Sequence, residues 1–232
     1  MFYNATYIIL LPAILFTLYA QAQVNRNFNK YSRVRNMRGL TGAQAARRML
    51  DANGLHDVAV EHIRGSLTDH YDPRYRVLRL SHSVHDVASV AAVSVACHEV
   101  GHALQHAEDY TPLLMRNNIV PLVNFASRLS WPLILVGILL LGNGSYAMGD
   151  TLFMIGVIAF SSVILFHAVT LPVEFNASNR AMAQMDSLGL ISYEEQSGAK
   201  RVLRAAAMTY VASLAMAILN LVRILAIRGN RN

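Results

Sequence analysis

The sequence predicts a mainly α-helical integral membrane protein with about four transmembrane helices and one small α+β domain. Of its 232 residues, 54% are hydrophobic and only 15% are charged, whereas an average soluble domain carries about 25% charged residues. The hydrophobic residues are also gathered into long uncharged stretches. This composition excludes a disordered chain, and the single cysteine, Cys97, excludes a disulfide scaffold.

The first uncharged stretch covers residues 1–25, with its most apolar part at residues 7–20. Basic residues follow this stretch, beginning at Arg26 and Lys30, and none precedes it. A secretory signal peptide has the opposite order, with its basic residues in front. We therefore expect an uncleaved N-terminal transmembrane anchor over residues 1–25.

Three further stretches lack charge: residues 129–149, 151–173 and 205–222, which are 21, 23 and 18 residues long. A transmembrane helix needs about 20 apolar residues, with a range of about 17–25. We expect residues 129–173 to form a helical hairpin that turns within residues 143–150. Residues 205–232 are expected to form a fourth transmembrane helix and a tail.

The basic residues predict an orientation and a partner. Residues 21–50 hold seven Lys and Arg and no acid, whereas residues 143–150 hold no Lys or Arg. By the positive-inside rule, residues 26–128 and 174–204 should lie in the cytoplasm of a multi-pass protein in the cell (inner or plasma) membrane. The formal net charge is +6, but the basic residues flank apolar blocks, which favours a lipid bilayer over nucleic acid as the partner.

Residues 26–128 should form the small α+β domain. The order of its predicted elements is a helix over residues 43–53 capped by Thr41, a strand within 58–63, a hairpin within 67–81 that turns at residues 72–73, and a long helix over 86–109. Residues 174–204 form a separate cytoplasmic segment in this interpretation.

The long helix carries the sequence HEVGH, in which His98 and His102 flank Glu99. Residues four apart on a helix lie one turn apart on nearly the same face, so both imidazoles can bind one ion. Zinc binds neutral imidazole readily and keeps an open position in catalytic sites. Glu99 can accept a proton from a zinc-activated water. The motif predicts a Zn²⁺ cofactor and a hydrolytic site with Glu99 as its base.

A third protein ligand has two candidates, His106 and Glu174. His106 lies two helical turns after His98, about 12 Å along the axis, which is too far for one ion. Glu174 follows the third apolar stretch, where Pro172 is expected to end or bend the helix. Since a hairpin of two transmembrane helices separates them, the segment of Glu174 and the α+β domain should lie on the same side of the membrane. We expect zinc on His98, His102 and Glu174.

The chain resembles the YugP-type membrane zinc metallopeptidases, a gluzincin family that is similar in plan to the HtpX-like membrane proteases. The resemblance extends over nearly all residues and is carried, in order, by LTDHYDP with VLRLS, VACHEVGHALQHA, LVNFASRLSWPLILVG, TLPVEFNAS and RAAAMTYVASL. It implies a zincin-like metallopeptidase domain, zinc on His98, His102 and Glu174, and Glu99 as the base. HtpX-like proteases have an Asp four residues after their ligand Glu. Ser178 occupies that position here, so the corresponding carboxylate is either absent or supplied by another residue, for which Asp186 is a candidate.

The resulting hypothesis is a membrane-embedded zinc metalloendopeptidase whose substrates are peptides or unfolded membrane proteins, acting in membrane protein processing or quality control. An edge strand of the hairpin could bind an extended substrate. The alternatives are a non-proteolytic zinc-binding membrane adaptor and a metal transporter. Glu99 argues against the adaptor, because a structural zinc site needs no carboxylate beside its ligands. The absence of carboxylates from the uncharged stretches argues against the transporter.

Several other residues have roles that the sequence leaves open. The group that stabilises the oxyanion could be Arg180, Tyr193 or Tyr210, or His70 in the hairpin. The remaining histidines of the α+β domain are expected at the surface: His56, His62, His82 and His85.

Overall fold

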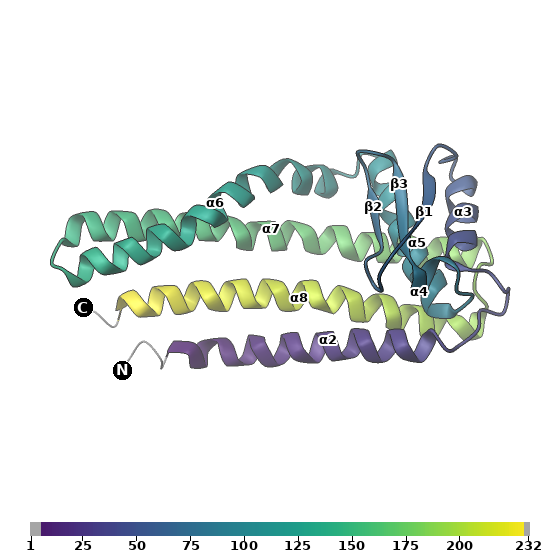
Figure 1. Cartoon of the computed structure of the whole chain (residues 1–232), viewed down its shortest axis with the longest axis horizontal. Coiled ribbons are helices and arrows are strands. Elements are labelled where there is room, and N and C mark those ends of the chain that lie inside the picture. The colour runs from purple at the N-terminus through teal and green to yellow at the C-terminus, as the bar shows by residue number, and fades with distance from the viewer. Residues whose placement is uncertain (1–5, 230–232) are drawn as a thin grey trace. The chain divides into compact units, whose positions relative to one another are not determined.

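The computed structural model describes residues 6–229, which are mainly helical and include one small three-stranded sheet (Figure 1). The prediction of a mainly α-helical chain with a small α+β part is confirmed at this level. The elements are η1 (Thr6–Leu10), α2 (Leu11–Tyr31), α3 (Gly42–Ala52), β1 (Ala59–Ile63), β2 (His70–Asp72), β3 (Val77–Ser81), α4 (His82–His85), α5 (Val90–Ala107), α6 (Thr111–Gly142), α7 (Tyr146–Ser187) and α8 (Tyr193–Gly229).

Four of the described helices are long and apolar enough to cross a membrane, as the uncharged stretches predict: Thr6–Tyr31, Thr111–Gly142, Tyr146–Ser187 and Tyr193–Gly229. They are longer than predicted, and the turn between α6 and α7 is only residues 143–145. Pro172 was expected to end or bend the helix. It does not end α7, because α7 continues to Ser187. Apolar segments tolerate such prolines more readily than soluble helices do. Residues 1–5 of the predicted anchor and residues 230–232 of the tail lie outside the described residues.

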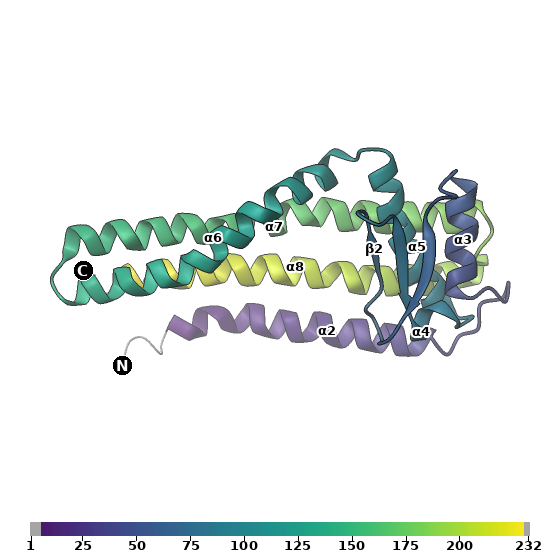
Figure 2. The ribbon, with the colours of Figure 1, turned by 45° about the horizontal axis from the view of Figure 1, so that its top comes forward.

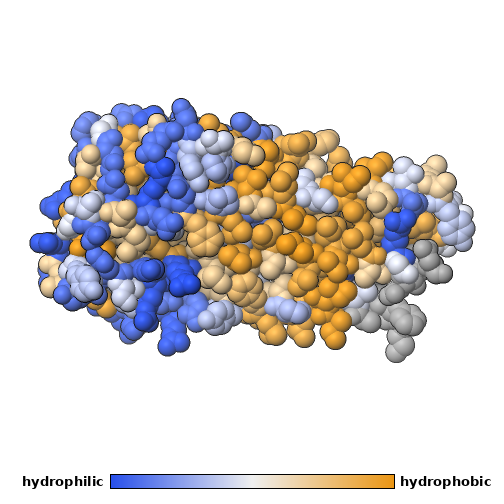
Figure 3. Space-filling model, turned by 180° about the vertical axis from the view of Figure 1, so that it is seen from behind, coloured by the Kyte–Doolittle hydropathy of each residue, from blue (hydrophilic) through white to orange (hydrophobic). Residues whose placement is uncertain are grey.

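The chain divides into two compact units, which we call the helical unit (residues 1–19, 114–171 and 210–232) and the sheet unit (residues 20–113 and 172–209). The helical unit has a small core that includes Phe153 and Ile224. Its outer surface is largely hydrophobic, as Figure 3 shows for one face. Exposed large side chains of this unit include Leu15, Leu18, Leu122, Phe125, Leu135, Leu139, Ile158 and Leu165. Such a surface suits lipid rather than water.

Two arginines of the helical unit, Arg223 and Arg228, have partners within it. Arg228 lies 2.6 Å from the carboxylate of Asp150. The guanidinium of Arg223 lies over the ring of Tyr7, 3.8 Å from its centroid, and is nearly buried. Removing a charge from water costs free energy, and pairing of this kind offsets part of that cost.

The sheet unit contains the sheet in the order β1-β3-β2, with β1 parallel and β2 antiparallel to β3. The predicted hairpin is therefore confirmed, and β2 is an edge strand. The predicted helix after Thr41 is also confirmed, because α3 begins with a capping box between Thr41 and Gln44. Helix α5 contacts α3, β2 and β3, and Figures 1 and 2 show it running beside the sheet.

The long helix predicted over residues 86–109 begins later than expected. A single turn, α4, ends at His85, and α5 begins only at Val90. The side chain of Ser89 accepts a hydrogen bond from the backbone N–H of Ala92 and so caps α5. The sequence did not predict the break between α4 and α5, because the residues on both sides of it are compatible with a helix.

Candidate metal centre

Helix α5 brings the two histidines of the HEVGH sequence together. His98 and His102 lie one turn apart, and their ring centroids are 4.8 Å apart in an edge-on arrangement. The helix is rich in Ala and Val and fully buried along its first turns, from Val90 to Ser94. Packing of this apolar surface fixes the helix in the sheet unit, so the two imidazoles project from a rigid element.

Glu174, from α7, completes a cluster of three metal-binding side chains. Its Oε2 atom lies 3.4 Å from Nε2 of His98 and 3.5 Å from Nε2 of His102. Two ligands that each bind zinc at about 2.1 Å in a tetrahedral shell are about 3.4 Å apart. The chemistry and the spacing of these three donors therefore fit a zinc ion, with a fourth position left open.

A glycine allows α5 and α7 to come this close. A Cβ atom at Gly101 would lie only 2.5 Å from the carbonyl oxygen of Ala177, which is closer than carbon and oxygen atoms can pack. Gly101 lies between the two histidines and Ala177 follows Glu174 by three residues. The contact thus sets the separation of the two helices at the level of the three ligands.

The other ring nitrogen of each histidine has a partner of its own. Nδ1 of His102 lies 3.0 Å from Oε1 of Gln105, and Nδ1 of His98 lies 3.2 Å from the hydroxyl of Ser178. Because an amide oxygen only accepts, Nδ1–H of His102 donates to it and leaves the Nε2 lone pair facing Glu174. This is the tautomer that a metal ion requires.

Gln105 connects this arrangement back to α7. Its side chain is fully buried, and its Nε2 donates to the carbonyl oxygen of Val173 at 2.8 Å and to Oδ1 of Asn176 at 2.9 Å. Nε of Arg180 donates to the same Asn176 oxygen at 2.7 Å. Every polar atom of the Gln105 amide is therefore used, and the amide joins His102 to the turn of α7 that carries Glu174.

Glu99 lies beside the cluster and faces strand β2. Its Oε2 accepts a hydrogen bond from the backbone N–H of Tyr71 at 3.2 Å. Burial raises the pKa of Glu99, while the neighbouring His98 and His102 act in the opposite direction. A buried carboxylate with a raised pKa, next to possible metal ligands, is suited to accept and return a proton.

His106 does not join the three ligands but holds the edge strand. Its Nδ1 lies 2.9 Å from the hydroxyl of Tyr71, so Tyr71 contacts α5 both through its backbone and through its side chain. The sequence gives no sign of this role for Tyr71, nor of the roles of Gln105 and Asn176. A polar residue three positions after a predicted ligand is the only signal that could have found Gln105.

The remaining candidates lie elsewhere. Asp186, considered as a replacement for the missing Asp, is exposed and accepts a hydrogen bond from Gln196, whereas the hydroxyl of Ser178 lies 3.2 Å from Nδ1 of His98. His70 is exposed and contacts the carbonyl oxygen of Thr68, and Tyr193 is 84% exposed.

Of the other two predicted oxyanion groups, Arg180 belongs to the network around Gln105, because it donates to Asn176. Arg180 pairs with Glu108 at 2.7 Å, and Tyr210 belongs to the helical unit. The thiol of Cys97 is fully buried, which raises its pKa to about 12, so this residue contributes to packing.

A cavity of about 310 Å³ opens next to Ser178 in the sheet unit. Its wall combines apolar side chains with two cationic ones, and its residues are Phe175, Ser178, Asn179, Met182, Lys200, Leu203, Arg204 and Ala207. A cavity of this size can take an amino-acid side chain or another small group.

Comparison with known proteins gives a consistent result. A family model described as "Putative neutral zinc metallopeptidase" matches residues 6–229. The chain is also similar to a protein of Bacillus subtilis (strain 168) named "Putative membrane protease YugP", with 49% identity over 213 residues, which cover 92% of each chain. No solved structure matches the chain.

Replacement of Glu174 should identify the third ligand. We expect Glu174→Ala to lower the zinc content of the purified protein strongly, and Glu174→Gln to weaken zinc binding less, because the amide keeps a neutral oxygen donor. His106→Ala should retain zinc, since its Nδ1 contacts Tyr71. Metal analysis after dialysis measures all three. Loss of zinc in His106→Ala but not in Glu174→Ala would contradict this ligand set.

Gly101→Ala should force α5 and α7 apart. Gly→Ala inside a helix usually stabilises it by about 0.5–1 kcal/mol, but here the added Cβ meets the Ala177 carbonyl oxygen. We expect destabilisation of about 1–3 kcal/mol and weaker zinc binding, measured by thermal unfolding in detergent and by zinc titration. Gly229→Ala is the control, because a Cβ there meets no described atom within 4 Å. Unchanged zinc affinity in Gly101→Ala would show that the close contact does not position the ligands.

Proposed function

Because the chain belongs to the neutral zinc metallopeptidase family, we propose that it is a membrane-embedded zinc metalloendopeptidase that hydrolyses peptide bonds. The observation that supports this most directly is the convergence of His98, His102 and Glu174 beside the buried Glu99. A purely structural zinc site has no use for a buried carboxylate next to its ligands, whereas a hydrolytic site requires one.

His98, His102 and Glu174 are the residues that would hold the ion. A zinc ion in such a site polarises a carbonyl group and makes water more acidic. The chain's own contribution is to fix the ligands before the substrate arrives. Gln105 and Ser178 do this by holding the Nδ1 atoms of the two imidazoles, because second partners of this kind orient metal-binding histidines.

Glu99 is the proposed general base. It accepts the proton of the attacking water and then donates it to the nitrogen of the leaving amine, so the carboxylate returns to its starting state. Covalent catalysis by Cys97 is not part of the proposal, because this side chain is fully buried in the core of the sheet unit.

Strand β2 is the proposed binding element for the substrate. It is the antiparallel edge of the sheet, and Tyr71 in this strand contacts Glu99 directly. An extended peptide that pairs with β2 would therefore pass beside the proposed base. Only unfolded or loop segments can adopt this conformation, which fits a role in the processing or quality control of membrane proteins.

The four membrane-length helices support a multi-pass protein, and we place the active site on the cytoplasmic side. The basic residues between residues 26 and 50 support this orientation. Arg228 lies in the last turn of α8, which is outside the cytoplasm in this orientation, where the positive-inside rule disfavours basic residues. Its ion pair with Asp150 offsets this positive charge.

Glu99→Gln should retain zinc and lose hydrolysis by about 10²–10⁴-fold, because an amide cannot accept the proton. The amide oxygen can still accept the N–H of Tyr71, so we expect the fold to persist. The measurement is cleavage of a mixed peptide library by the purified, zinc-loaded protein, and Ser66→Ala on the exposed loop before β2 is the control. A variant that cleaves peptides as fast as the parent would refute the role of Glu99.

Single cysteines should report the orientation in intact cells after Cys97 has been replaced by Ala. We expect Ser145→Cys, in the turn between α6 and α7, to react with a membrane-impermeant thiol reagent. Lys30→Cys, near the end of α2, should react only after the membrane is permeabilised. Both positions are exposed, so solvent access does not differ between them. The reverse labelling pattern would place the site outside the cytoplasm.

A further inference from the structure

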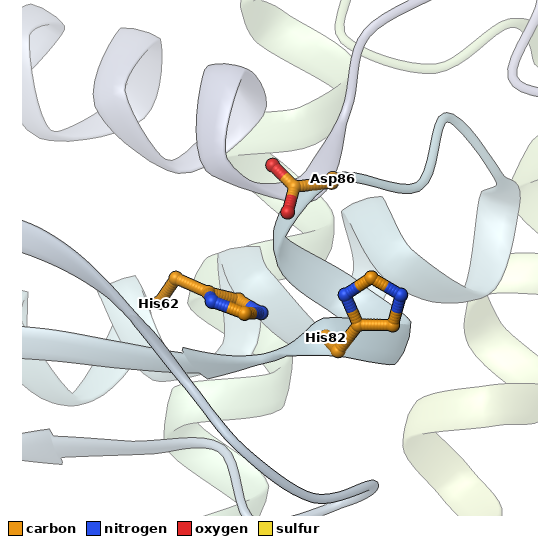
Figure 4. Close-up of side chains that lie close together, drawn as sticks. All are labelled: His62, His82 and Asp86. Atoms are coloured by element: carbon orange, nitrogen blue, oxygen red, sulfur yellow. The ribbon is translucent and has the colours of Figure 1, made fainter.

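A second cluster of metal-binding side chains lies on the surface of the sheet unit and has no part in the proposed hydrolysis. It consists of His62, His82 and Asp86, all exposed, with one donor atom of each within 4.8 Å of the others. Figure 4 shows the three side chains turned toward a common space.

The fold brings these residues together from two parts of the chain. Strands β1 and β3 are parallel, with His62 opposite Leu80. His82 follows the last residue of β3 and begins α4, whose single turn ends at His85. His82 and Asp86 are then four residues apart and lie on the same side of this turn. The buried Val84 anchors the other side of the turn.

The chemistry of the cluster suits a transition metal. Two imidazoles and one carboxylate are ligands that Zn²⁺ accepts, whereas Ca²⁺ and Mg²⁺ require a shell made of oxygen atoms. A zinc ion needs donors about 3.4 Å apart. Rotation of exposed side chains can close the present spacing to that value.

A third imidazole, that of His85, supports the carboxylate. Its Nδ1 lies 2.7 Å from Oδ1 of Asp86, and its ring centroid is 5.2 Å from that of His62. The contact with His85 uses one carboxylate oxygen of Asp86, and the second oxygen can bind an ion.

We propose that His62, His82 and Asp86 form a second binding site for a divalent transition-metal ion, best matched by Zn²⁺, with His85 as the residue that positions Asp86. The ion would join β1 to α4, just before the helix that carries His98 and His102. All three side chains are exposed, whereas Glu174 of the first centre is buried.

The number of zinc ions per chain tests this proposal. Purified full-length protein in detergent is dialysed against buffered Zn²⁺, and bound metal is counted. We expect two equivalents in the parent and one in His62→Ala/His82→Ala, with peptide hydrolysis unchanged. His98→Ala/His102→Ala should also bind one equivalent, and this one should be lost when all four histidines are replaced. His56→Ala is the matched control, because His56 is an exposed histidine beside a carboxylate, Asp51, outside the cluster. It should keep two equivalents.

A single substitution tests the second site by its zinc affinity and does not require that the double variants fold. His85→Ala should weaken zinc binding at the second site by about 10–100-fold, the usual effect of removing a residue that orients a ligand. A His62→Ala/His82→Ala variant that binds as many equivalents as the parent would overturn the proposal. Failure of the Glu99 proposal would leave these counts unchanged, so the two outcomes are distinguishable.

Discussion

The close contact between α5 and α7 is the constraint on which the candidate metal centre depends. Two of its ligands come from one helix and the third from a helix more than 70 positions later in the sequence. Only a residue without a side chain, Gly101, allows the Ala177 carbonyl to approach. If the helices were farther apart, Glu174 would leave the reach of both imidazoles, and its buried carboxylate would lose the partners that compensate for its removal from water.

Buried polar groups then make this contact specific. Gln105 has no accessible surface, yet its amide is bonded to His102 on one side and to Val173 and Asn176 on the other. A slip of either helix by one residue would break several of these bonds and leave the amide unsatisfied, which is unfavourable in a buried environment. The network therefore selects one register of α5 against α7, and this register is the one in which the three ligands meet.

The sequence alone could predict the parts of this arrangement that depend on local spacing. The four-residue separation of His98 and His102 predicts their shared face, and the charge pattern predicts four long apolar helices. The proximity of Glu174 could be inferred from topology. Gln105 and Ser178 could not be assigned, because their partners lie far away in the sequence and many polar residues precede or follow a ligand. The predicted start of the long helix was wrong for a related reason. Ser89 caps α5 because of its extended backbone conformation, which the sequence does not reveal.

The hydrogen bond between Tyr71 and Glu99 has a consequence for the order of events at the edge strand. One backbone N–H donates well to a single acceptor, and that of Tyr71 donates to Glu99. A chain that adds to β2 at this residue competes for the same hydrogen. If a peptide adds to β2 as proposed, its binding would displace the Glu99 carboxylate from the Tyr71 N–H, because both would accept the same hydrogen.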